Sequence, residues 1–213
     1  MTILRQLVPD QNDHDERNDC LQQFHDIIGV IIFLEIPLSV VALARFINLK
    51  QSNVSEYLGY FGSLLHIPRN VDDSVRILHR SFPDFLLQTK DDSFRVDSPA
   101  THARITTHCL RIMNDGLKHN ICDLPSYGTE RKTIDDQAVS QSLSPELQYS
   151  CRYWAHHLVK SNPHTWLIDS AFSFLKGHFL HWMEAMNILF LGSETVEVIN
   201  MLSSQQFIQV RFL

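Results

Sequence analysis

The sequence lacks the motifs by which nucleotide-binding enzymes are most easily recognised. Its seven glycines are scattered and none precedes a lysine, so there is no G-x-x-x-x-G-K-[ST] loop, in which backbone N–H groups and a lysine hold phosphates. An acidic stretch after an apolar strand, which a Mg²⁺ site would need, is also missing. These absences predict that the chain alone neither binds nor hydrolyses a nucleotide, and we expect no cofactor.

Cysteines and basic residues are also few. The four cysteines are far apart, with no C-x-x-C pair, which favours free thiols in a reducing compartment over a disulfide framework. There are 18 lysines and arginines against 24 aspartates and glutamates, a formal net charge of −6, so the chain is poorly suited to binding nucleic acid phosphates. Because residues 1–18 are polar and acidic, unlike a signal peptide, we expect a cytoplasmic protein.

No uninterrupted hydrophobic run is long enough for a membrane span. The most apolar window, residues 27–44, contains Glu35 and Pro37 near its middle, whereas a span needs about 20 apolar residues. Two packed helices with a break between them explain this window better. With 44% hydrophobic and 20% charged residues, the chain has an ordinary globular composition and can form one large core or two small ones.

The apolar positions recur at helical spacing over most of the chain. In the first part, the pattern predicts helices at 19–33, at 39–46 with Ser39 as a cap, and at 53–65 with Asn53 and Glu56 at the start. Short apolar runs at 64–67 and 75–78, separated by turn residues, predict a β-hairpin. A helix at 80–87 and an extended segment at 94–96 follow. Three helices and then a hairpin is the order of a winged-helix domain.

From Ser98 onward the pattern is helical throughout. We expect helices beginning at Ser98-Pro99 and at Ser144-Pro145, separated by a polar loop at 120–143. Residues 168–190 predict two helices broken near Gly177, and 194–203 a last helix. The predicted fold class is therefore mainly α, with a winged-helix domain at 1–97 (three helices plus a β-hairpin) followed by an α-helical domain at 98–213.

The residues that could carry chemistry form weak patterns. His178 and His181 stand at i, i+3, and His119 and Cys122 have ligand-like spacing, but neither pair has the second pair that a tetrahedral metal site requires. Thiols at positions 109 and 151 fall in apolar helical stripes, which favours inert core cysteines over a Cys/His nucleophile. We therefore predict no metal site and no catalytic residue.

A resemblance gives a sharper prediction. Residues 76–87 read RILHRSFPDFLL, and this segment resembles the H-x-S-F-x-D-F-L segment in the winged-helix domain of NACHT proteins, which belong to the STAND class of signal-transducing ATPases. Residues 38–44, 120–124, 145–158 and 178–185 resemble further blocks of fungal NACHT proteins, in the same order. The resemblance covers roughly residues 2–205, which is nearly the whole chain.

The resemblance implies a role for His79. In that family the matching histidine contacts the terminal phosphate of bound ADP and helps to hold the ATPase closed, whereas a lone histidine without the resemblance would be interpreted only as the end of a strand. Ser81 would cap the next helix, Phe82 and Phe85 would lie in the core, and Asp84 would be a surface or helix-start residue. Two positions depart from the family pattern, since the residue after the histidine, often proline, is an arginine here and a proline occupies the usually polar position 83.

The implied function is that of a non-catalytic regulatory module. Its partners would be an ATPase core preceding residue 1 and sensor repeats following residue 213, with homo-oligomerisation in a full-length protein and neither nucleic acid nor membrane as a partner. A fragment, a truncated paralogue and a partial gene model all remain open. The process would be fungal immune-like or incompatibility signalling.

The alternative is a winged-helix DNA-binding regulator. Its third helix would lie in the major groove and would need arginine, lysine, asparagine or glutamine on its exposed face. Residues 51–65 contain no lysine or arginine, and Glu56 is the one charged residue among them. The expected wing adds Arg69 but also Asp72 and Asp73, so phosphate neutralisation would be poor.

Overall fold

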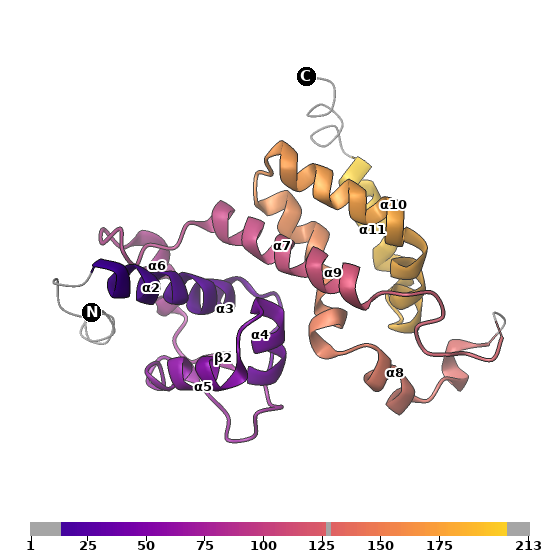
Figure 1. The fold of residues 1–213 in the computed structure, drawn as a ribbon, viewed down its shortest axis with the longest axis horizontal. Coiled ribbons are helices and arrows are strands. Elements are labelled where there is room, and N and C mark those ends of the chain that lie inside the picture. The colour runs from indigo at the N-terminus through magenta and orange to yellow at the C-terminus, as the bar shows by residue number, and fades with distance from the viewer. Residues whose placement is uncertain (1–13, 127–128, 204–213) are drawn as a thin grey trace. The chain divides into compact units, whose positions relative to one another are not determined.

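The computed structural model describes residues 14–126 and 129–203 and is mainly helical (Figure 1). The chain divides into two compact units, the first up to Thr101 and the second from His102. This division falls inside helix α7 (Ser98–Gly116), whereas the sequence placed a domain boundary after residue 97, just before that helix. Each unit is described by itself below.

The first unit begins with a helix that contains one π-helical turn. Helix α2 (His14–Phe24) continues through the π-helix η1 (His25–Gly29) into α3 (Val30–Phe33), and helix α4 (Val40–Ile47) follows. The predicted cap of α4 is confirmed, because the Ser39 hydroxyl accepts a hydrogen bond from the Ala42 N–H at 3.2 Å. The helix ends at Asn48, which has the left-handed backbone conformation common at helix C-termini, with φ of 59°.

Helix α5 (Gln51–Gly59) differs from its predicted form. It begins before Asn53, so the predicted start at residues 53 and 56 is wrong. Val54, Tyr57 and Leu58 are buried, and burying this face keeps residues 51 and 52 helical. Asn53 is exposed within the helix, and its side chain accepts a hydrogen bond from the Ser52 hydroxyl at 3.1 Å.

The predicted hairpin is confirmed as a short two-stranded antiparallel sheet. Strand β1 (Leu65–His66) pairs with β2 (Arg76–Ile77), with Leu65 opposite Ile77 and His66 opposite Arg76. The Leu78 N–H donates to the Leu64 carbonyl at 2.9 Å, and the Val75 N–H donates to the Leu38 carbonyl at 3.0 Å. Helices and hairpin thus occur in the predicted order, while a winged-helix identity remains a prediction.

Helix α6 (Ser81–Gln88) follows the hairpin, and the segment after it closes the core of the first unit. Phe94 and Val96 are buried, but the segment expected to be extended at 94–96 forms no strand, and Phe94 lies in a turn. Instead the Val96 N–H donates to the Leu86 carbonyl at 2.9 Å, and the Phe94 ring meets Phe24 edge-on at 5.4 Å. The apolar residues there are thus held by contacts with α2 and α6.

The second unit is helical in the part that the structure describes, and it corrects the sequence reading twice. Its elements after α7 are the 3₁₀-helix η2 (Arg131–Thr133) and the helices α8 (Asp136–Ser142), α9 (Pro145–Lys160), α10 (Thr165–Ile188) and α11 (Gly192–Ser203). Helix α8 lies in the segment predicted as loop, and the Asp135 carboxylate caps it by accepting from the Gln137 N–H at 3.1 Å.

Helix α10 runs without the predicted break at Gly177. One glycine in a helix interior costs only about 1 kcal/mol relative to alanine. The burial of Leu167, Ile168, Phe174 and Trp182 along the same helix outweighs this cost.

Aromatic rings and one bidentate ion pair join the last three helices of the second unit. Trp154 on α9 meets Phe174 and Trp182 on α10 edge-on, with ring centroids 5.6 and 6.1 Å apart. The Trp182 indole N–H donates to the Cys151 carbonyl at 2.9 Å. Arg152 on α9 donates to both carboxylate oxygens of Glu194 on α11, at 2.8 and 2.7 Å.

The helices that the structure describes include none with the length and apolar character of a membrane span.

Candidate functional site

The residue predicted to sense nucleotide lies on the surface of the first unit. His79 follows strand β2 by two residues and precedes α6 by two. Its side chain is exposed, while its carbonyl accepts a hydrogen bond from the Phe82 N–H at 3.0 Å. The backbone is therefore fixed at the start of a helix and the imidazole is accessible from outside the unit, as contact with another domain would require.

The other residues of the motif support this helix start in the predicted way, with two exceptions. Phe82 is buried and Asp84 is exposed, whereas Phe85 is only half-buried. Ser81 is the first residue of α6 and not its cap, so the predicted capping role is wrong. Arg80 occupies the cap position with helical backbone angles (φ −57°, ψ −31°) and no side-chain cap bond, because the chain already winds into the helix before position 81.

The charged surface of the hairpin is mixed in sign. His66 and Arg76 are exposed cross-strand partners, and with Asp72 and Asp73 they line an open pocket of about 360 Å³. The exposed residues of α5 include Gln51, Asn53 and Glu56 but no lysine or arginine. Because a DNA-reading helix needs basic neighbours, this surface does not favour the DNA-binding alternative.

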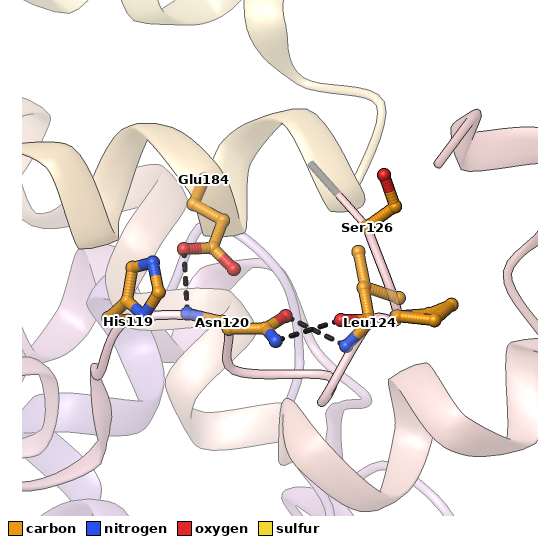
Figure 2. Close-up of a pocket in the computed structure, with 6 residues that line it drawn as sticks. His119, Asn120, Leu124, Ser126 and Glu184 are labelled. Carbon is orange, nitrogen blue, oxygen red and sulfur yellow. Dashed lines mark hydrogen bonds between the residues drawn. The ribbon is translucent and has the colours of Figure 1, made fainter. Parts of the chain in front are cut away.

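The second unit contains a pocket of about 450 Å³ lined by His119, Asn120, Leu124, Pro125, Ser126 and Glu184 (Figure 2). The Glu184 carboxylate accepts hydrogen bonds from two consecutive backbone N–H groups, those of Asn120 and Ile121, each at 3.1 Å. Such an N–H pair binds anionic oxygens well. Here the anion is the protein's own carboxylate, so the contact attaches the loop after α7 to helix α10.

Asn120 also organises the loop itself (Figure 2). Its side-chain oxygen accepts from the Leu124 N–H at 2.8 Å, and its side-chain amide donates to the Leu124 carbonyl at 3.0 Å. Its φ of 49° lies in the left-handed region, which asparagine tolerates better than most residues. Both polar side chains at the centre of this pocket are therefore engaged within the protein, and we assign the pocket a structural role.

A chain of three buried polar side chains lies in the core of the second unit. His102 on α7 and His157 on α9 approach through their Nδ1 atoms at 2.7 Å, and the Nε2 atom of His157 lies 2.7 Å from the Tyr149 hydroxyl. All three side chains are at most 3% exposed. Burial, and next the neighbouring His102, lowers the pKa of His157 from 6.5 to about 3, so His157 is neutral at physiological pH.

The cysteines predicted to be inert are buried thiols. Cys109 on α7 is fully buried, and burial raises its pKa to about 12. Burial also raises the pKa of Cys151 on α9 well above its ordinary value. At neutral pH both are protonated, whereas a nucleophilic cysteine needs its thiolate form.

The histidine pair of α10 does not assemble into a larger ligand set. The Nδ1 atoms of His178 and His181 lie 3.3 Å apart, and the His178 ring stacks on Phe174. Within residues 14–126 and 129–203, no group of three or more histidine, cysteine, aspartate or glutamate side chains could hold a metal ion.

The Glu184 contact and the buried histidine chain were missed by sequence reasoning. One feature of the sequence could have indicated that His157 is buried: it lies three residues after Trp154, within the apolar stripe of α9. A second signal lies in the blocks that carried the resemblance. Residues 120–124 contact 178–185 through Glu184, and 145–158 contact 178–185 through the Trp182 indole. The segments that carried the resemblance are thus among those that join the elements of the second unit.

Comparison with known proteins gives one partial match. The chain is 25% identical over 224 aligned positions to the vegetative incompatibility protein HET-E-1 of Podospora anserina, and the match covers 92% of this chain but 16% of that protein. The chain therefore spans about a sixth of its relative's length. No protein-family model matches the chain, and neither does any solved structure. The partial match is a weak indication of the NACHT family, in agreement with the resemblance in the sequence.

Proposed function

We propose that this chain is a non-catalytic regulatory segment of a NACHT-type signalling ATPase in fungal incompatibility signalling. In this proposal the first unit acts as a winged helix, and His79 contacts the terminal phosphate of ADP bound in an ATPase core outside the chain. The second unit links that core to sensor repeats. No DNA-binding role is proposed, because no observation favours one.

The observation that carries the proposal is the exposure of His79 on a fixed backbone. An exposed imidazole can donate an N–H to a phosphate oxygen of another domain, and protonation of the ring would strengthen that bond. The buried Phe82 and the α6 backbone hold the residue in place without any contribution from its ring. The ring is therefore available for a partner.

The test is a graft into the matched relative. The stretch of the incompatibility protein that this chain matches is replaced by the chain, and release of a fluorescent ADP analogue is followed by stopped flow. A hydrogen bond to a charged group contributes about 1.5–3 kcal/mol, so His79→Ala should speed ADP release about 10- to 150-fold.

The matched control is His66→Ala, which removes another exposed histidine of the same hairpin and should leave release unchanged. Equal release rates from the original and His79→Ala grafts would contradict the sensor role. Calorimetry on the isolated chain gives a separate check. We expect the isolated chain to bind ADP with a dissociation constant no lower than about millimolar, because it has no phosphate loop. Micromolar binding would contradict the proposal that the nucleotide binds to a core outside this chain.

A further inference from the structure

Helix α10 carries two large apolar side chains that are exposed among the described residues of the second unit. Trp166 is 55% exposed and Leu180 is 74% exposed. They lie seven residues before and seven residues after Ser173, which is also exposed. Seven residues are close to two helical turns, so the three positions lie along one face of the helix.

The charged residues beside this face are placed so that they complement a second copy. Asp169 and Lys176 are exposed and lie on the same flank of the face, four residues before and three residues after Ser173. Seven residues apart on one helix, they are separated by about 10 Å and are too distant to pair with each other. Consider a second copy of α10 that runs antiparallel to the first and is centred on the same residue, Ser173. Lys176 of each copy then lies opposite Asp169 of the other.

We propose that α10 pairs with α10 of a second copy of this chain, antiparallel and centred on Ser173. In this arrangement Trp166 of each copy packs on Leu180 of the other, and two Asp169–Lys176 ion pairs flank the apolar contacts. In a parallel pairing the two copies of this flank would lie on opposite sides of the interface, so no Asp169–Lys176 ion pair would form across it. The contact is isologous, the usual form of a closed dimer.

Gly177 fits the same arrangement. A side chain at this position would meet nothing within 4 Å among the described residues, so no described packing requires a glycine there, and glycine weakens a helix interior by about 1 kcal/mol. Between two antiparallel helices it would lie beside the partner's Ser170, where small residues allow the axes to approach to about 8 Å. The dimer would thus give this glycine a packing role that the described residues of its own chain do not.

The dimer should be weak. One helix face buries less than the roughly 1,600 Å² of a standard interface, so we expect dissociation constants on the order of 10⁻⁵ to 10⁻⁴ M. Sedimentation velocity over a concentration series of the full chain measures this directly. Because each substitution counts twice in a symmetric dimer, Leu180→Glu should weaken association at least about tenfold. Val196→Glu, at an exposed apolar position of α11, is the matched control and should change nothing.

Cross-linking and charge reversal test the register. Under mild oxidation Ser173→Cys should form a covalent dimer, since the two copies of this residue meet at the symmetry axis, whereas two Leu180→Cys residues would lie about 20 Å apart and should not. The unsubstituted chain, which contains free cysteines, controls for other disulfides. Asp169→Lys alone should weaken the dimer, and the double variant Asp169→Lys/Lys176→Asp should restore it.

Several results would overturn the proposal. These are a monomeric full chain at millimolar concentration, association that Leu180→Glu leaves intact, cross-linking through Leu180→Cys in place of Ser173→Cys, and failure of the double charge reversal to restore association. A chain that associates only after deletion of residues 204–213 would also overturn it, because that result would identify the chain's own end as the occupant of the face.

Discussion

The two units differ in where their histidine side chains lie, at the surface or in the core. In the first unit the histidines and arginines of the hairpin region, including His66, Arg76 and His79, are exposed, and the described core is almost wholly apolar. In the second unit a pair of histidines and a tyrosine are buried and hydrogen-bonded to one another. Both units have similar residue types available, but among the described residues the two buried histidines lie in the second unit.

This contrast distinguishes exposed polar side chains, which can bind a partner, from buried ones, which stabilise the fold. A buried polar group is tolerated only when it is hydrogen-bonded, and its loss leaves its partners unsatisfied. An exposed one is satisfied by water and can be changed at little cost to folding. We therefore expect function to depend on exposed groups in the first unit and stability to depend on buried ones in the second.

The largest expected effect is that of His157→Ala. The substitution leaves the Tyr149 hydroxyl and the His102 ring without their buried partner and opens a cavity, so we expect a loss of about 3 kcal/mol in the free energy of unfolding. Urea denaturation measures it, with His164→Ala, at an exposed position, as the matched control. A loss below about 1 kcal/mol, within the range of ordinary substitutions, would contradict the claim that the buried histidines stabilise the second unit.

The pH dependence of stability sharpens the same contrast. Burial lowers the pKa of His157 from 6.5 to about 3. Between pH 3 and 6.5 this histidine is therefore protonated in the unfolded chain but neutral in the folded chain. Stability should therefore fall as pH drops below about 6.5, by up to about 1.4 kcal/mol per pH unit.

Denaturation between pH 6.5 and 5, where most carboxylates remain ionised, measures this slope, and a variant without His157 separates its share from that of the other histidines. In His157→Gln, which can still form hydrogen bonds but does not titrate, the slope should be smaller. The same slope in both proteins would assign the acid sensitivity to other groups.

The smallest expected effect is that of His79→Ala on the isolated chain. The side chain is exposed, and exposed substitutions usually change stability by no more than about 0.5 kcal/mol. Thermal denaturation of the two proteins should therefore give nearly the same midpoint. A loss above about 1 kcal/mol would mean that the ring supports its own unit, and an outward-facing role would no longer follow.

Much of the fold was predictable because local chemistry decides it. The Ser39 cap, the hairpin and the helices beginning near Ser98 and Pro145 follow from side-chain caps, turn residues and apolar spacing within a few residues. The errors arose where tertiary burial overrides local preference. Gly177 does not break α10 because the buried face of the helix holds it together, and α8 forms in a polar segment because Val139 and Leu143 are buried.

The candidate site also contains features that the sequence predicts and features that it does not. The position of His79 between hairpin and helix was predicted, because it follows from the order of elements. The Glu184 contact was not, since it joins a carboxylate to backbone N–H groups 63 and 64 residues away, and no local pattern in the sequence specifies such a partner. The His102–His157 contact spans 55 residues and was missed for the same reason.

The hairpin that positions His79 is itself lightly held. Its strands are two residues long each, and a single isolated bridge joins it to Ser39. Segments with so few interstrand bonds open at low free-energy cost, well below that of global unfolding. Release of a partner from this edge would thus involve fraying of the two short strands, while the buried side chains of Leu65 and Val75 keep the hairpin attached to the core of the first unit.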